Sequence, residues 1–153
     1  MTTIIKARGE FQKGFSVFLA GSVAGDDWRN DLVKRLGDTE IIFLDPRSDD
    51  YSNMDHTAKD PMFRAQVHWE TDGLEQADVI VLYFNHDSEA PISLLEFGLF
   101  AGSGRMIVRC PDGYKHKGYV DILCNRYGVK QVNSLGEIAD EIRSRYSKIN
   151  EQD

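Results

Sequence analysis

The sequence predicts a three-layer α/β sandwich, in which one parallel sheet lies between two layers of helices. Two observations lead to this fold class. Short runs of branched and aromatic residues alternate with longer helical patterns, and most of these runs are continuously apolar. Continuous apolar character is typical of strands covered on both faces, and parallel neighbours need a connection as long as a helix.

The predicted strands are the five runs at 15–20, 40–44, 78–84, 105–110 and 129–132. The first helix follows Asp26 and Asp27, whose side chains suit a helix start, and repeats apolar residues every fourth position. The second and third helices open at Pro61 and Pro91, where the missing N–H costs nothing. Two further helices are predicted at about 119–126 and 135–146.

This alternation predicts a flavodoxin-like or Rossmann-like sandwich with a five-stranded parallel sheet in the order 2-1-3-4-5. The chain, 1–153, is expected to form a single domain with a core of about 15–146, because the first dozen residues and the last seven are polar. Gly21, Asp45, Asn85 and Cys110 then lie at one rim, where open α/β sheets bind ligands. The long loop 45–60 leaves the same rim.

Composition narrows the possible partners. The formal net charge of −7 argues against a duplex nucleic acid or an anionic membrane as partner. No apolar run approaches the length of a membrane span, and we expect a soluble, cytoplasmic protein. The two cysteines lack metal-binding spacing and no histidines pair at i,i+4, so neither a metal nor a cofactor is expected.

Two glutamates stand among apolar residues of neighbouring predicted helices. Glu96 lies four residues after Ile92 and three before Leu99, so we expect it to share a face with side chains that pack inward. Glu70 lies three residues after Val67 on a similar stripe. Two carboxylates on core-facing sides are costly unless they meet a shared polar cleft, and such pairs perform nucleophilic and acid/base chemistry.

Five motifs of the sequence resemble, in their order and spacing, the nucleoside 2-deoxyribosyltransferase-like family. They are "FLAGS" (18–22), "DPR" (45–47), "QVHWE" (66–70), "LEQAD" (74–78) and "APISLLEFG" (90–98). The resemblance implies cleavage or transfer at the N-glycosidic bond of a nucleoside or nucleotide. It also implies that Glu96 is the nucleophile that attacks the anomeric carbon, and that Glu70 is the second catalytic acid.

Six further residues are candidates for substrate binding. The list is Gly21, Ser22, Asp45, Arg47, Trp69 and Asn85. The glycine loop 21–27 suits an anion, although a tight turn explains it equally well. Arg47 suits a phosphate or carboxylate, or a salt bridge to Asp45 or Asp49. Trp69 suits a base pocket or a subunit contact, and Asn85 suits a sugar, a base or a simple turn.

Two alternatives stay open, because Val17 or Phe18 and Ala90 stand where the family places a tyrosine and an aspartate. One is a nucleotide-binding or sensor module without turnover. The other is a TIR-like hydrolase of NAD or nucleotides. The resemblance also implies a homodimer or larger homo-oligomer, for which Trp69, Phe97 and Phe100 are expected to offer apolar surface.

Overall fold

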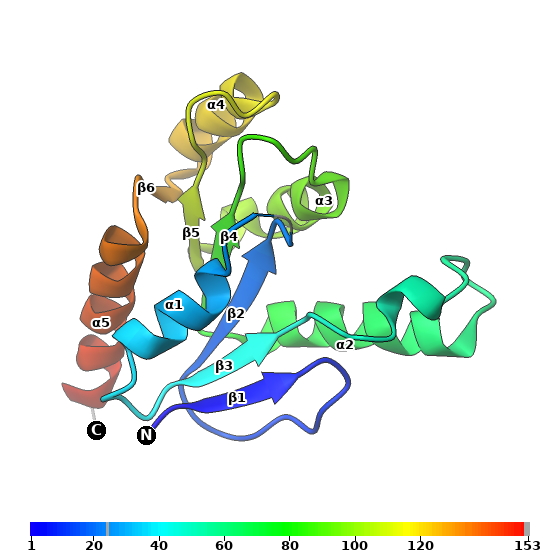
Figure 1. The fold of residues 1–153 in the computed structure, drawn as a ribbon. Coiled ribbons are helices and arrows are strands. Elements are labelled where there is room, and N and C mark those ends of the chain that lie inside the picture. Colours follow the sequence, from blue (N-terminus) through cyan, green and yellow to red (C-terminus); the bar gives the residue numbers. More distant parts are fainter. Residues whose placement is uncertain (24, 152–153) are drawn as a thin grey trace.

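The protein, seen in a computed structural model that describes residues 1–23 and 25–151, is built on one parallel sheet (Figure 1). Its strands are β1 (Thr3–Lys6), β2 (Ser16–Gly21), β3 (Ile42–Asp45), β4 (Val79–Tyr83), β5 (Met106–Arg109) and β6 (Lys130–Val132). They lie in the order β1-β3-β2-β4-β5-β6, with each neighbouring pair parallel. The predicted fold class and the order of the five predicted strands are confirmed.

The predicted number of strands was wrong, because β1 adds a sixth at the edge of the sheet. Its residues pair with β3, from Thr3 opposite Ile42 to Lys6 opposite Asp45. Only Ile5 of these four residues is buried. An edge strand this short leaves almost no apolar pattern in the sequence, which is why the opening residues were expected outside the core.

The described residues form five α-helices and two short 3₁₀ helices, of which all but the last helix lie between strands. They are α1 (Trp28–Arg35), η1 (Tyr51–Asn53), α2 (Pro61–Gln76), α3 (Pro91–Phe100), η2 (Ala101–Ser103), α4 (Lys117–Tyr127) and α5 (Leu135–Glu151). The predicted starts at Pro61 and Pro91 are confirmed, and the Asp27 side chain caps α1 by accepting from the Asn30 amide. Among the described residues, no helix combines the length and apolar character that crossing a bilayer requires.

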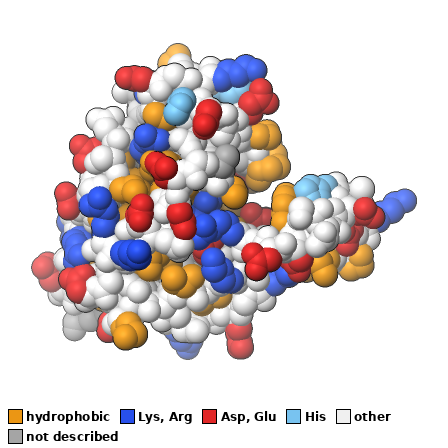
Figure 2. All heavy atoms as spheres, viewed as in Figure 1, with side chains coloured by type: hydrophobic (Ala, Val, Ile, Leu, Met, Phe, Trp, Pro, Cys, Tyr) orange, Lys and Arg blue, Asp and Glu red, His pale blue; other side chains and the backbone are white. Residues whose placement is uncertain are grey.

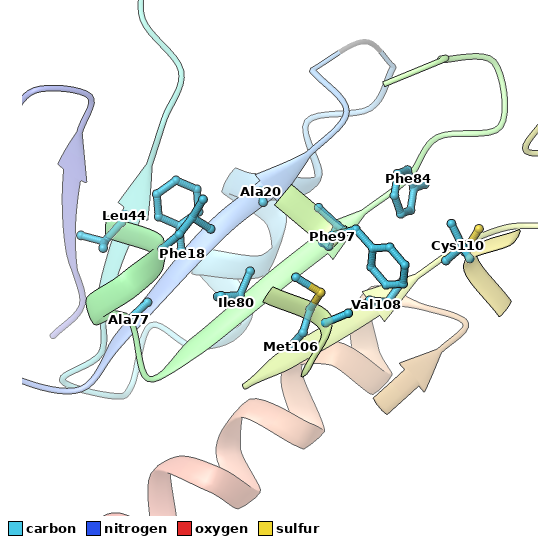
Figure 3. Close-up of a cluster of buried hydrophobic side chains, with 14 of the residues drawn as sticks. Phe18, Ala20, Leu44, Ala77, Ile80, Phe84, Phe97, Met106, Val108 and Cys110 are labelled. Carbon is cyan, nitrogen blue, oxygen red and sulfur yellow. The ribbon is translucent and has the colours of Figure 1, made fainter. Parts of the chain in front are cut away.

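The helices cover both faces of the sheet, and successive strand residues point to opposite layers. Val17 and Leu19 pack with α1 and α5, whereas Phe18 and Ala20 pack on the side of α2, α3 and α4. Figure 3 shows the second of these clusters, in which Phe97 of α3 reaches the side chains of β4 and β5. A shift of one residue in β2 would exchange its two faces, so this packing sets the register of the central strand.

The carboxyl ends of the strands meet at one edge, as the register shows. Gly21 lies opposite Tyr83, and Lys6 lies opposite Asp45. Helix α2 packs closely on β2, because a Cβ atom added at Gly73 would lie 2.8 Å from the Phe18 ring. The amino-terminal part of α2 extends beyond the sheet (Figure 1). The sheet edge and the two helices α2 and α3 therefore frame the predicted ligand rim.

Candidate active site

The loop after β2 is held against the end of β4. Gly21 has φ of 124°, and an added Cβ would collide with the Tyr83 carbonyl, so only glycine fits there. The Ser22 amide donates to Tyr83 O at 2.9 Å, and the Ser22 hydroxyl accepts from the Asn85 amide at 3.0 Å. Of the predicted loop 21–27, residue 24 lies outside the described residues. The structure therefore brings Gly21, Ser22 and Asn85 together at the rim.

Asp45, at the end of β3, is buried and surrounded by cations. Arg47 binds it through Nε and Nη2, with the Nη2–Oδ2 distance at 2.8 Å, and Lys6 Nζ also lies 2.8 Å from Oδ2. Arg29 Nε lies 3.9 Å from the other oxygen. Burial alone would raise the pKa of Asp45, but the hydrogen bonds from Arg47 and Lys6 outweigh it and lower this pKa to about 2. Asp45 is therefore a permanent anion.

Of the two alternatives for Arg47, the salt bridge to Asp45 is present in the structure. Its Nη1 also lies 3.0 Å from Asp27 Oδ1, at the start of α1. On the face seen in Figure 2, basic and acidic side chains lie side by side over α1 and the nearby end of β3. An open hollow of about 600 Å³ borders this cluster. Its lining is Lys6, Ala7, Arg8, Asn30, Arg47, Ser48, Asp49 and Asp50.

Glu70 and Glu96 form the second acidic region of the rim, and both are partly buried. Desolvation, together with the negative charge of Glu70, raises the pKa of Glu96 to about 8, while the charge of Arg29 opposes both effects. Desolvation raises the pKa of Glu70 to about 7, against a hydrogen bond from Gln66 and the charge of Arg29. Both pKa values lie near neutral pH, so the two groups titrate as a coupled pair, and forms with one carboxylate and one carboxylic acid are populated there.

The orientation predicted for α3 was wrong. Ile92, Leu95 and Leu99, which were expected to pack inward beside Glu96, are 55%, 64% and 71% exposed. Ser93 and Phe97 face the core instead, so Glu96 lies at the boundary of the packed face. Because almost every residue of this helix is apolar, its sequence gives little indication of which side is covered. Figure 2 shows hydrophobic side chains on this side of the molecule, next to a notch between α3 and the outer part of α2.

Trp69 lies behind Glu70 in the packed layer. It is buried, its indole N–H donates to Gly9 O at 2.8 Å, and its ring stacks on Phe11 with centroids 5.4 Å apart. Trp69 and Phe97 were expected to offer apolar surface for assembly, and that expectation was wrong because both are buried. The position of Trp69 between Phe11 and Phe18 holds the helix that carries Glu70.

Two polar residues of the site were missed in the sequence. Arg29 is 2% exposed, and it precedes Leu32 by three residues and Leu36 by seven, which is the spacing of one helix face. Gln66 is 1% exposed and lies one turn before Glu70 on α2. The same test that singled out the glutamates, a polar residue on an apolar stripe, identifies Arg29 as well.

Within the part of the chain that the structure describes, no group of three or more His, Cys, Asp or Glu side chains could hold a metal ion. Cys110 and Cys124 are buried free thiols, and burial raises the pKa of both. A buried thiol with a raised pKa is a poor nucleophile. The two glutamates, in contrast, are carboxyl groups whose pKa values are raised toward neutral pH.

A family model described as nucleoside 2-deoxyribosyltransferase like matches residues 14–114 of the chain. None of the curated proteins compared with the chain matches it. The matched residues run from β2 to β5 and include Glu70, Glu96 and the Asp45 cluster except Lys6. Strand β1 precedes the match, and α4, β6 and α5 follow it.

Proposed function

Because the chain belongs to the nucleoside 2-deoxyribosyltransferase-like family, we propose that it cleaves or transfers the N-glycosidic bond of a nucleoside or nucleotide. The observation that carries the proposal is the pair of partly buried glutamates on α2 and α3 with raised pKa values. Groups with such shifts, at the carboxyl edge of an α/β sheet, are typical of catalytic sites.

In the proposed reaction, the Glu96 carboxylate attacks the anomeric carbon, the bond to the base breaks, and a glycosyl-enzyme ester forms. The base leaves with its bonding electron pair and takes up a proton, which Glu70 delivers. Water or a second base then attacks the anomeric carbon, the bond from that carbon to the Glu96 oxygen breaks, and Glu70 accepts the proton that the attacking group loses. The reaction uses the singly protonated form of the pair in which Glu70 carries the proton and Glu96 is ionised; because the pKa of Glu96 is the higher of the two, this is the minor of the two singly protonated forms.

Residues of the same rim are proposed to bind the substrate. Gly21 and Ser22 are proposed to contact an anionic or hydroxyl group through the Ser22 hydroxyl, since the Ser22 amide donates to Tyr83 O, and the Asn85 side chain suits the sugar or base. Arg47, which is paired with Asp45, lines the open hollow of about 600 Å³, which has room for the polar part of a nucleotide. The buried place of Trp69 favours a role in holding α2 over direct stacking on the base.

The proposal is tested by incubating the protein with a panel of deoxynucleosides, ribonucleosides and their 5′-phosphates, and by following free base by chromatography. A second base added to the mixture separates transfer from hydrolysis. We expect Glu96→Gln to lose turnover by at least about a thousandfold and Glu70→Gln by about ten- to a hundredfold, since only Glu96 forms the covalent bond. Ligand binding with no release of base, by a folded protein, would support a binding module instead.

We also propose that a second copy of the chain covers the exposed side of α3. Ile92, Leu95 and Leu99 form a continuous exposed apolar stripe next to Glu96, and exposed stripes of this kind are typical of interfaces between subunits. Light scattering at micromolar concentration should give a dimer or larger mass. Leu95→Glu should lower that mass, and a wild-type monomer would contradict the proposal.

A further inference from the structure

The guanidinium of Arg29 is fixed behind the loop that follows β2. Its Nε donates to Leu19 O at 3.0 Å, Nη2 to Gly21 O at 3.1 Å, and Nη1 to Ser22 O at 3.1 Å. The guanidinium carbon also lies 4.4 Å from the centre of the Trp28 ring. The guanidinium group carries five N–H donors in one plane, so it can bind three carbonyls that lie around it. The compact ammonium group of a lysine does not match this arrangement.

The charge of Arg29 is only partly compensated by its surroundings, since its nearest carboxylate oxygen, Asp45 Oδ1, lies 3.9 Å from Nε. Its hydrogen bonds go to neutral carbonyls, and Asp45 is already bound at 2.8 Å by both Arg47 and Lys6. Three cations therefore face two carboxylates, Asp45 and Asp27, in this cluster. The remaining positive charge of Arg29 favours the ionised forms of Glu70 and Glu96 and opposes the effect of desolvation.

We propose that Arg29 is a positioning residue of the active site: it shapes the β2–α1 loop from behind and supplies the fixed positive charge that favours the ionised form of the glutamate pair. The charge of Arg29 lowers the pKa of both Glu70 and Glu96 against desolvation. Burial lowers the pKa of Arg29 itself to about 10, so it stays protonated at neutral pH. The other charged groups that shift the pKa values of Glu96 and Arg29 are Glu70 on α2, Asp27 before α1, and Asp45 and Arg47 at and after the end of β3.

The expected effect of Arg29 on the reaction rate rests on the proposed function, but the direct test, a titration of the two glutamates, does not require turnover. Glutamate side chains labelled with ¹³C are titrated by NMR in the wild type, in Arg29→Lys and in Arg29→Gln. The signals of Glu70 and Glu96 are assigned by their loss in Glu70→Gln and Glu96→Gln. Arg35→Gln, which removes an exposed arginine from the same helix, is the matched control.

We expect Arg29→Gln to raise the titration midpoint of Glu96 by about one pH unit, because a nearby opposite charge is lost. Arg29→Lys keeps the charge and should keep the midpoint near the wild-type value. Both variants should speed hydrogen exchange of the Ser22 amide, because neither side chain can bind all three carbonyls. With an active substrate, the acidic limb of kcat/KM should move to higher pH in Arg29→Gln and not in Arg29→Lys.

Unchanged midpoints in Arg29→Gln, or equal rises in both variants, would overturn the charge assignment. If Arg29→Gln does not fold, Arg29→Lys decides alone: the proposal requires a wild-type Glu96 midpoint together with faster Ser22 exchange. A wild type that releases no base from any substrate would contradict the proposed function, and the NMR midpoints would still test Arg29.

Discussion

Two groups of acidic side chains at the same edge of the sheet have pKa values shifted in opposite directions. Asp45 is buried, and its pKa falls to about 2. Glu70 and Glu96 are partly buried, and their pKa values rise to about 7 and about 8. Burial acts in the same direction on all three, so the difference comes from their partners.

The partners of Asp45 are cations in direct contact, whereas those of the glutamates are weaker. Lys6 and Arg47 each place a nitrogen 2.8 Å from Asp45 Oδ2. Glu70 has a hydrogen bond from Gln66, and the charge that reaches Glu96 comes from Arg29, whose donors are taken by carbonyls. The first region thus holds charges that stabilise the fold, and the second keeps carboxyl groups that can exchange protons near neutral pH.

The largest expected effect on stability is that of Asp45→Asn. Removing one charge from a buried cluster leaves Lys6 and Arg47 without their anion, which costs about 3 kcal/mol of unfolding free energy. Urea denaturation at neutral pH measures this loss. Asp49→Asn is the control, because Asp49 is exposed in the same loop and should leave the unfolding free energy unchanged. Equal midpoints for the two variants would contradict the structural role of Asp45.

The second expected effect is that of Glu96→Gln, which should increase the unfolding free energy, and by an amount that depends on pH. The folded pKa of Glu96, about 8, exceeds its ordinary value of 4.5, so between these values the folded state binds more protons than the unfolded state. Stability therefore falls as pH rises through this window, and the loss is complete above the folded pKa. Glutamine does not ionise, so Glu96→Gln should be more stable than the wild type by about 2 kcal/mol at about pH 9, after allowance for solvent screening.

The measurement is urea denaturation of both proteins at about pH 5 and about pH 9, with Asp87→Asn, an exposed acid near α3, as the control. At the lower pH the two proteins should have nearly equal stability, since Glu96 is then protonated in the folded state. A wild type that matches Glu96→Gln at both pH values would contradict the raised pKa of Glu96.

The central strands were predictable because continuous apolar runs record burial on both faces. The glutamates were singled out on apolar stripes that the structure leaves exposed: Val67, Ile92 and Leu99 are 42%, 55% and 71% exposed. Glu70 and Glu96 are partly buried nevertheless, because each lies beside residues of its helix that face the core. The rim followed from topology, since parallel strands bring Gly21, Asp45 and Asn85 to one edge without any contact being known.

Three features could not be predicted, because they depend on tertiary contacts that produce no periodic pattern in the sequence. Strand β1 forms because β3 offers an edge with which it can pair. A strand of four residues with one buried side chain has no apolar pattern from which it could be predicted. The covered side of α3 is set by the sheet beneath it, because the helix is apolar on nearly all sides. The role of Arg29 comes from three backbone carbonyls, and their arrangement is a property of the folded loop.

The smallest expected effect lies between the two regions, at Arg8. Its Nη1 donates to Gln66 Oε1 at 2.8 Å and its Nη2 lies 2.8 Å from Asp50 Oδ2, while Gln66 Nε2 donates to Pro46 O at 2.9 Å. Arg8→Met leaves the buried Gln66 oxygen without this donor, which costs about 1 kcal/mol of unfolding free energy.

Because Gln66 also hydrogen-bonds Glu70, Arg8→Met should slightly lower the rate of base release as well. Asp50→Asn is the matched control, since it removes the outer ion pair and keeps the bond between Arg8 and Gln66. Urea denaturation of both variants should therefore give the larger loss for Arg8→Met, because exposed ion pairs contribute little. Equal losses of unfolding free energy would mean that Arg8 acts through its ion pair with Asp50, and would contradict a role of its bond to Gln66.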